Sequence, residues 1–283
     1  MPELPEVECV RRSLLPHVLG RRVDSVRIYR PGVCDCRDAQ GKKRPASPAR
    51  LLEGATVESI LRHGKQLAMV ASTGGVVCVH LGMTGLMCVS HAQRDATAHG
   101  RHDHVVWTLA GGRKMTFHDP RRFGGLWAFP SQDSLRATRW SALGPDALTI
   151  TGGGLYEALG GSGRAVKAGL LDQSAVAGVG NIYADESLFG IGMDPRTRCA
   201  RVRLDRWEAL AAEVRRVLSA AIEHGGSTVR NYVNADGSAG SAQTRHAVYG
   251  RGGLACVRCA GTLCQGVVGQ RTTVWCPRCQ GRG

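Results

Sequence analysis

The sequence opens with Met-Pro-Glu-Leu-Pro-Glu-Val-Glu, residues 1–8, and continues as CVRRSLLPHVLG to Gly20. Pro5 suits the first turn of a helix, and valines and leucines then recur at three- and four-residue intervals. Gly20 is a suitable residue to end this helix. We therefore predict a helix from Pro5 to about Leu19, which would anchor the first residues of the chain.

The same stretch places reactive groups at the chain end. If Met1 is removed, Pro2 presents a secondary amine with a pKa of about 8, so part of it is neutral at physiological pH. Such an amine can attack a carbon that becomes a carbonyl and form a cationic iminium, with Glu3 or Glu6 as a nearby general acid or base. The alternative is that this proline only protects the chain end, which would require no catalytic role for it. Pro2, Glu3 and Glu6 are candidate catalytic residues.

Composition points to a polyanionic partner. The 283 residues carry a formal net charge of +14 and a pI near 9.7, which favours nucleic acid, although an arginine-rich genome composition would also raise the charge. No apolar run has transmembrane length, and the acidic start is unlike a signal peptide. We expect a cytoplasmic protein with no membrane partner.

The first half of the chain predicts a β-sandwich. Short apolar segments are separated by Gly and Asp turns between Val23 and Pro130. The predicted strands are 23–29, 56–61, 66–71, 76–81, 104–109, 114–118 and 126–129. Residues 34–47 are predicted to form an irregular polar loop.

Three loops interrupt these strands. Lys65 follows His-Gly, His80 begins HLGMTG (80–85), and DPRRFG occupies 119–124. Met83 and Phe123 stand beside glycines in such loops, which indicates insertion into a partner, although local packing would explain each one separately.

The second half changes to helical periodicity. We predict helices at 167–177, at 182–189 and from Asp205, with Glu208 as its capping-box partner, to Gly225. The turn Gly178–Asn181 leads into a helix N-terminus that can bind phosphate, although a tight turn would need the same glycines. Residues 231–247 are polar and aperiodic, which is typical of a mobile loop or lid.

The cysteines give a specific local signal. Of eleven, four form Cys256-x2-Cys259 and Cys276-x2-Cys279, separated by 16 residues. This spacing predicts a tetrahedral, structural Zn²⁺ site on a small β-hairpin, with a redox dithiol pair as the alternative. Cys264 lies between the pairs without ligand spacing.

Taken together, the motifs resemble those of the formamidopyrimidine-DNA glycosylase and endonuclease VIII family. They span nearly the whole chain in the family's order. The matching segments are PELPEVE at 2–8, HLGMTG at 80–85, HDH at 102–104, DPRRFG at 119–124, VKAGLLDQ at 166–173, GVGNIYADESLF at 178–189, VYGRGG at 248–253 and the four cysteines.

The resemblance implies an α+β fold in three parts. An N-terminal β-sandwich with flanking helices is expected at 1–135, a linker at 136–153, a helix-two-turn-helix domain with the lid at 154–245, and a four-cysteine zinc finger at 246–283.

The resemblance also implies activity and roles. The family excises oxidised purines (8-oxoguanine, formamidopyrimidines) from double-stranded DNA and cleaves the strand by β,δ-elimination, as a monomer associated with the nucleoid. Pro2 would form the Schiff base, Glu3 would donate a proton, Glu6 would support it, Lys65 would assist β-elimination and Arg271 δ-elimination. The implied DNA contacts are His80, Met83, His102, Arg121, Phe123, Lys167 and Asn181.

Two other functions remain open, and some segments depart from the family. An endonuclease VIII-type enzyme would act on oxidised pyrimidines, but that branch resembles PEGPEI rather than PELPEV with Leu4. A zinc-dependent protein that only binds damaged DNA would not need Pro2, Glu3, Lys65 or Arg271. Residues 160–164 are less basic than usual, the lid is rich in Gly and Ala, and the 34–47 loop has no assigned role.

Overall fold

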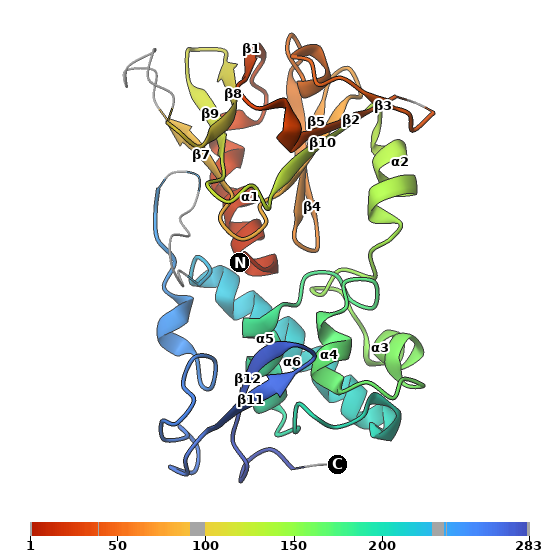
Figure 1. Ribbon diagram of the computed structural model, residues 1–283, viewed down its shortest axis with the longest axis vertical. Coiled ribbons are helices and arrows are strands. Elements are labelled where there is room, and N and C mark those ends of the chain that lie inside the picture. Colours follow the sequence, from red (N-terminus) through yellow and green to blue (C-terminus); the bar gives the residue numbers. More distant parts are fainter. Residues whose placement is uncertain (1, 39, 91–99, 228–234, 236, 282–283) are drawn as a thin grey trace. The chain divides into compact units, whose positions relative to one another are not determined.

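The chain folds into two units, each with its own core (Figure 1). Unit 1 comprises Met1–Ala142 with Gly225–Gly240, and unit 2 comprises Leu143–His224 with Ser241–Gly283. The computed structural model describes residues 2–38, 40–90, 100–227, 235 and 237–281. Met1 and residues 231–234 and 236 of the predicted lid lie outside the described residues.

Unit 1 is a β-sandwich with helix α1 (Leu4–Val18) packed against it. One sheet has the antiparallel order β1 (Val23–Ile28), β8 (Asp103–Leu109), β9 (Lys114–His118), β7 (Leu86–Ser90). The other has the order β3 (Lys43–Arg44), β2 (Cys34–Arg37), β10 (Gly125–Phe129), β6 (Val76–His80), β5 (Gln66–Ala71), β4 (Val57–His63). Only the β2–β10 pairing among these is parallel. Helix α2 (Gln132–Leu135) and a π-helical turn (Arg136–Trp140) follow β10.

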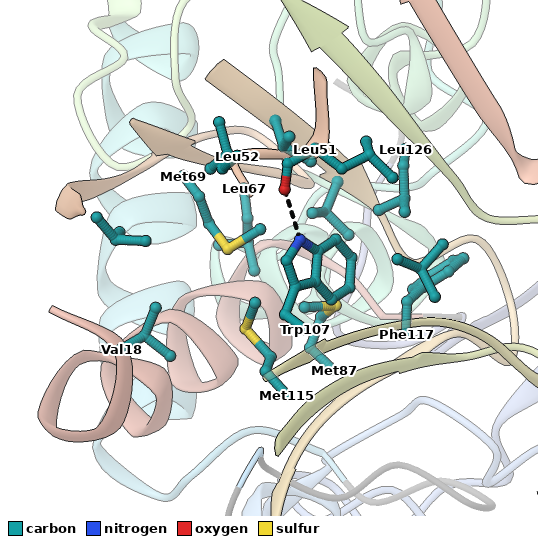
Figure 2. Packing of buried hydrophobic residues seen from close by; sticks show 14 of the residues in the cluster. Val18, Leu51, Leu52, Leu67, Met69, Met87, Trp107, Met115, Phe117 and Leu126 are labelled. Atoms are coloured by element: carbon teal, nitrogen blue, oxygen red, sulfur yellow. Dashed lines mark hydrogen bonds between the residues drawn. The ribbon is translucent and has the colours of Figure 1, made fainter. Parts of the chain in front are cut away.

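The sandwich core forms around Trp107 (Figure 2). Its ring is fully buried among residues of both sheets and of α1, including Met87, Met115 and Val18. The indole Nε1 donates to the carbonyl of Leu51 at 2.8 Å, so the one polar atom of this side chain is satisfied inside the core. This packing fixes the strand ends from which the predicted site loops extend.

One sequence prediction in unit 1 is wrong, because the polar loop expected at 34–47 contains β2 and β3. A further strand, β7, follows the HLGMTG segment. β2 lies parallel to β10, about ninety residues away in sequence, with Leu126 opposite Cys34. A strand that is stabilised by such a distant partner leaves little local signal.

Unit 2 is mainly helical, with a C-terminal hairpin. The helices are α3 (Gly152–Leu159), α4 (Val166–Leu171), α5 (Asn181–Gly190) and α6 (Leu204–Glu223), and the hairpin pairs β11 (Cys264–Val268) with β12 (Arg271–Trp275). Short 3-10 turns lie at Pro31–Val33 and Ala49–Leu51 in unit 1 and at Cys199–Arg201 and Ala242–Arg245 in unit 2.

Helix α3 corrects the linker prediction. It begins at three consecutive glycines, which sequence reasoning treats as a helix breaker. A Cβ on Gly152 would lie only 2.4 Å from the backbone of Glu208, so α3 and α6 approach too closely for any other residue. Thr151 caps the helix through a 3.1 Å hydrogen bond from Gly154 N.

Helices α4 and α6 also differ from prediction. α4 ends at Leu171 rather than 177, and α6 starts one residue before Asp205, with Arg203 as N-cap. Asp205 therefore does not cap α6; it lies in the first turn and pairs with Arg203 at 2.8 Å. The predicted α+β fold of a sandwich, a helical part and a C-terminal hairpin is nevertheless confirmed. Among the described residues, no helix has the length and apolar character needed to cross a membrane.

Candidate active site and nucleic-acid interface

Pro2 and Glu3 lie at the buried start of α1. Glu3 is the N-cap, and its N–H donates to Glu6 Oε2 at 2.8 Å within a capping box. The other oxygen of Glu6 accepts from Ser227 N at 2.8 Å. Glu6 is 2% exposed and is committed to backbone N–H groups, which suits it to supporting Glu3 rather than to exchanging protons with a ligand.

Lys65 occupies the two-residue turn of the β4–β5 hairpin. His63 and Gln66 pair across this turn, and Gly64 has a φ of 54°, the left-handed conformation that such tight turns need. Lys65 is 9% exposed, so its position is set by the fold rather than by solvent.

His80 ends β6 directly opposite Gln66 and Gly125. Burial and the positive charges of Arg139 and Lys65 lower the pKa of His80 to about 4, so the imidazole is neutral at physiological pH. Arg139 is held in place by a 2.8 Å bond to Gln66 and by the ring of Trp127, whose centroid lies 3.4 Å from its guanidinium carbon.

The loops 80–85 and 119–124 are joined as one structure. A Cβ on Gly82 would lie 2.4 Å from the backbone of Phe123 and Gly124, so the two loops touch through glycine. Buried Asp119 accepts hydrogen bonds from Thr84 Oγ1 at 2.5 Å and from Gly124 N at 2.8 Å. Asp119 and Thr84 are structural residues of this site that sequence reasoning missed.

These joined loops expose three predicted DNA contacts. Met83 is 40% exposed and Phe123 is 55% exposed, although large apolar side chains are usually buried. The guanidinium carbon of Arg121 lies 4.5 Å from the centroid of the Phe123 ring. An apolar pair beside a cation can enter a base stack and satisfy an unpaired base edge.

A basic hollow adjoins the same loops. It has a volume of about 440 Å³ and is lined by Arg30, Arg121 and Arg122, together with Gly32, Val33 and Gly124. No acidic residue from the described part of the chain lines it, so the hollow suits an anion.

His102 precedes β8 and belongs to a small histidine cluster. Its ring meets the ring of His118 edge-on, with the centroids 5.9 Å apart, and His118 Nδ1 lies 2.7 Å from Asp103 Oδ1. His102 is half-buried at the end of the strand, with its backbone carbonyl bonded to Asp119 N at 3.0 Å.

In unit 2, Asn181 and Arg271 are close together. Asn181 begins α5, and its Nδ2 donates to the carbonyl of Thr272 at 2.9 Å. Arg271, the preceding residue, is the exposed first residue of β12. The backbone of β12 next to Arg271 therefore lies at the N-terminus of α5, where free N–H groups could bind a phosphate.

Lys167 is placed differently from prediction. Its side chain is fully buried, its Nζ lies 2.7 Å from Asp185 Oδ1, and it donates to Thr273 Oγ1 at 2.7 Å and to Thr272 O at 3.0 Å. The prediction that Lys167 contacts DNA is therefore corrected: an ammonium withdrawn from solvent and fully bonded inside the protein holds β12 instead.

Asp185 and Glu186 on α5 complete this anchoring of the C-terminal segment. Asp185 Oδ2 accepts from Val274 N at 3.1 Å, and burial raises the pKa of Asp185, partly offset by Lys167, to about 6. Glu186 accepts from three consecutive backbone N–H groups, those of Ala247, Val248 and Tyr249, at 2.8 to 2.9 Å. Sequence reasoning assigned neither carboxylate, because the backbone groups that they accept from lie more than sixty residues away in the chain.

The four predicted cysteines come together. The sulfur atoms of Cys256, Cys259, Cys276 and Cys279 all lie within 4.8 Å of one another, with 3.9 Å between Cys256 and Cys279 and 3.5 Å between Cys259 and Cys276. Tetrahedral bonds of about 2.3 Å place sulfurs about 3.8 Å apart, so the set fits a metal ion. Cys264 is not in the group.

The comparisons with known proteins decide the family. A family model of the formamidopyrimidine-DNA glycosylase N-terminal domain matches residues 1–126, and one of the formamidopyrimidine-DNA glycosylase H2TH domain matches residues 143–233. The chain belongs to the formamidopyrimidine-DNA glycosylase family. The resemblance inferred from the sequence is thereby confirmed, as is the prediction of a glycosylase and lyase at the level of the family.

Individual relatives cover the whole glycosylase chain. A formamidopyrimidine-DNA glycosylase of Xanthomonas axonopodis pv. citri (strain 306) is 42% identical, with 99% of this chain and 100% of the relative covered. The crystal structure of MutM (Fpg) from Thermus thermophilus matches with a TM-score of 0.85 at 38% identity over 100% of both chains. Lactococcus lactis Fpg in complex with abasic-site DNA matches with a TM-score of 0.86 at 30% identity, covering 99% of each.

Proposed function

We propose that this glycosylase removes oxidised purines, 8-oxoguanine and formamidopyrimidines, from double-stranded DNA and then cleaves the strand. The observation that carries the proposal is the presence, in one unit, of Pro2 and Glu3 at the start of α1 and Lys65 in the β4–β5 turn. A Lactococcus lactis Fpg mutant in complex with DNA containing Fapy-dG, which matches with a TM-score of 0.86, supports the purine assignment.

The reaction begins at Pro2. After removal of Met1, the Pro2 nitrogen attacks C1′ of the damaged nucleotide, the bond from C1′ to the base breaks, and the base leaves with a proton. Glu3 protonates the sugar ring oxygen as the ring opens, which leaves an iminium between C1′ and Pro2. Glu6 supports Glu3 through the Glu3 N–H.

Strand cleavage follows from the iminium, which acidifies the C2′ proton. Loss of that proton and of the 3′-phosphate is the β-elimination, which Lys65 assists. Loss of the C4′ proton and departure of the 5′-phosphate from C5′ is the δ-elimination, which Arg271 serves from the start of β12. Because both steps release phosphates, a cation at each position favours the developing charge.

DNA binding exposes the base to Pro2. The damaged base must leave the duplex, at a cost of a few kcal/mol, and Met83, Arg121 and Phe123 would fill the vacated space. His80 and His102 would contact the DNA. Lys65, Asn181 and Arg271 would contact phosphates, which orient the duplex without reading the sequence. Because each chain carries its own Pro2, a monomer suffices. We place the enzyme in the cytoplasm with the nucleoid.

The metal of the four-cysteine site would be Zn²⁺. Four thiolate ligands in a tetrahedral set leave no open position for a substrate, so the ion would be structural. It would hold the hairpin that carries Arg271.

The proposal is tested by single-turnover excision on matched duplexes. We expect fast release of 8-oxoguanine placed opposite cytosine, little activity on thymine glycol, and loss of strand cleavage in Pro2→Gly. Equal or faster excision of thymine glycol would favour the endonuclease VIII-type alternative. Unchanged cleavage by Pro2→Gly would remove Pro2 from the mechanism.

A further inference from the structure

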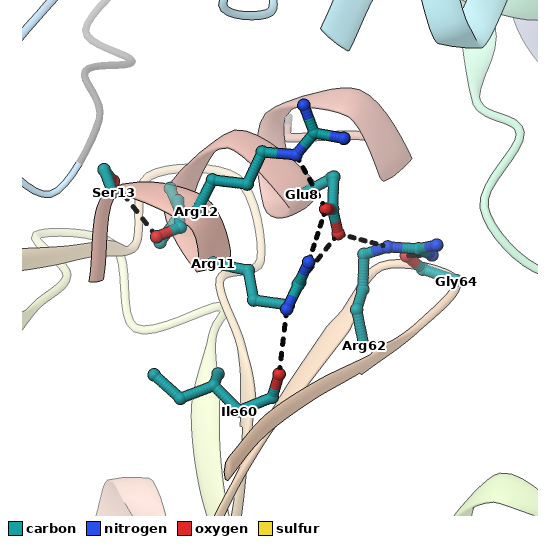
Figure 3. Close-up of polar contacts among 8 residues, drawn as sticks. Glu8, Arg11, Arg12, Ser13, Ile60, Arg62 and Gly64 are labelled. Atoms are coloured by element: carbon teal, nitrogen blue, oxygen red, sulfur yellow. Dashed lines mark hydrogen bonds and ion pairs between the residues drawn. The ribbon is translucent and has the colours of Figure 1, made fainter. Parts of the chain in front are cut away.

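Glu8 on α1 is buried and lies at the centre of a cluster with Arg11, Arg12 and Arg62 (Figure 3). Its Oε1 accepts from Arg11 Nη2 at 2.8 Å and Arg12 Nε at 2.9 Å, and its Oε2 accepts from Arg11 Nε at 2.9 Å and Arg62 Nε at 3.1 Å. Burial by itself would raise the pKa of Glu8, but these arginines outweigh it and hold the pKa at about 2. The carboxylate is therefore charged and fully bonded.

Two of these arginines extend from Glu8 to the backbone of the β4–β5 hairpin. Arg11 Nη1 donates to Ile60 O at 3.2 Å in the middle of β4, and Arg62 Nη1 donates to Gly64 O at 3.1 Å in the turn. The carbonyl of Gly64 belongs to the peptide bond that leads into Lys65. A hydrogen bond to this carbonyl restrains the plane from which the Lys65 side chain starts.

Glu8 and Arg62 link α1, which carries Pro2 at its start, to the turn that carries Lys65. Glu8 lies six residues after Pro2 on the helix that begins at Leu4. A chain of contacts lies entirely within unit 1. It runs from Pro2 along α1 to Glu8, and then through Arg62 and Gly64 O to Lys65. It connects the two groups that act in succession in the proposed reaction.

We propose that Glu8 is a positioning residue: through Arg62 it fixes the Gly64–Lys65 peptide relative to α1, and thereby the Lys65 ammonium relative to the Pro2 amine. This inference rests on the proposed function, in which Pro2 forms the iminium and Lys65 assists the elimination.

Attachment of α1 to the sandwich does not by itself explain the cluster. Val7, Val10, Leu14 and Val18 already bury an apolar stripe of α1 in the core. Burying charges costs desolvation energy, so an ion cluster adds less stability than packed apolar residues would. It adds defined geometry, because the planar Arg62 guanidinium joins the Glu8 carboxylate to one particular carbonyl.

The test is a double-mutant cycle between Arg62→Met and Lys65→Ala. Two rates are measured in single turnover at saturating DNA: formation of the borohydride-trappable Pro2 adduct, and strand cleavage. In the otherwise native chain we expect Arg62→Met to slow cleavage by roughly 10- to 100-fold, with a smaller effect on adduct formation, because misplacement of a catalytic group by about 1 Å has effects of this size. In the Lys65→Ala background, Arg62→Met should change cleavage by less than about twofold.

Arg12→Met is the matched control. Arg12 also binds Glu8, but its side chain is 59% exposed, and none of its hydrogen bonds or ion pairs with described residues reaches the β4–β5 turn. We expect its cleavage rate to stay within about twofold of the native rate. Glu8→Gln, if it folds, should follow Arg62→Met.

The outcomes separate the inference from the proposed function. An Arg62→Met defect of equal size with and without Lys65, or no defect at all, would overturn the positioning role and leave the proposed function standing. A Lys65→Ala variant that cleaves at the native rate would overturn the role of Lys65, and the inference with it.

Discussion

Lys167 Nζ and Asp185 Oδ1 lie 2.7 Å apart in a pair whose side chains are 0% and 1% exposed. This pair joins α4 to α5, and both members also bond to β12, Lys167 at Thr272 and Thr273 and Asp185 at Val274. The strand that begins with Arg271 is thus fixed to two helices by charged side chains. The family motif VKAGLLDQ at 166–173 contributes a structural cation here.

Lys167→Met should destabilise unit 2 by about 3–5 kcal/mol, because it leaves the Asp185 carboxylate buried without its partner. Urea denaturation checks this. The exposed pair Arg203–Asp205 is the control, and Arg203→Met should leave the free energy of unfolding close to the native value, because solvent screens exposed ion pairs. A stable Lys167→Met protein whose DNA affinity has become less dependent on salt would instead restore Lys167 as a DNA contact.

The depressed pKa of Glu8 predicts acid sensitivity. Because the pKa falls from its usual 4.5 to about 2 on folding, the unfolded chain binds this proton more tightly. The stabilisation is complete above about pH 4.5 and is lost as the pH falls towards 2, up to about 3 kcal/mol. The free energy of unfolding of Glu8→Gln should therefore fall less steeply over this range.

The control for that measurement is Glu58→Gln, which changes an exposed glutamate of β4. The free energy of unfolding of this variant should depend on pH as that of the native protein does. If Glu8→Gln also matches the native curve between pH 4.5 and 2, the cluster does not hold a charged Glu8.

Affinity for undamaged duplex should fall steeply with salt, because cationic contacts release counterions. Arg122 lines the basic hollow without lying at the predicted site of base insertion. We expect Arg122→Ala to reduce the slope of log affinity against log salt by about 1, measured by fluorescence anisotropy. A flat response of the native protein would contradict a phosphate-binding face.

Removal of the metal should abolish DNA binding and leave the sandwich folded. The finger's own core includes Val248, Leu263 and Val274 packed on Cys256 and Cys276, so loss of the ion should release the strand that carries Arg271. Metal analysis measures the bound ion, fluorescence anisotropy measures DNA binding, and hydrogen exchange of the sandwich strands measures whether unit 1 stays folded.

Cysteine variants supply the control for metal removal. Cys264→Ser should keep one ion per chain, because Cys264 lies outside the four-sulfur group, whereas Cys256→Ser should lose it. Full DNA binding by a verified metal-free protein would contradict the account.

Local patterns in the sequence predicted some elements closely. The N-terminal helix, predicted at 5–19, is Leu4–Val18, and the strand predicted at 66–71 is Gln66–Ala71. The cysteine group was also predicted, because two short pairs on one hairpin need no distant partner. Apolar periodicity and metal-ligand spacing both record contacts made nearby in the chain.

Features that depend on distant contacts were not predictable. The close approach of Gly152 to Glu208 makes a glycine run part of a helix, and β2 needs its partner β10. The burial of Lys167 depends on Asp185 and Thr273, and the resemblance to the family assigned it to DNA. The contact between Glu8 and Arg62 leaves no local pattern either, because the two residues are 54 positions apart.

The proposed reaction requires that Pro2 form a covalent bond with the damaged nucleotide. The most direct measurement is borohydride trapping on a duplex that contains 8-oxoguanine opposite cytosine, followed by mass mapping of the cross-linked peptide. We expect an adduct on the Pro2 nitrogen of a chain that has lost Met1. An adduct on a lysine, or intact binding with no adduct, would contradict it.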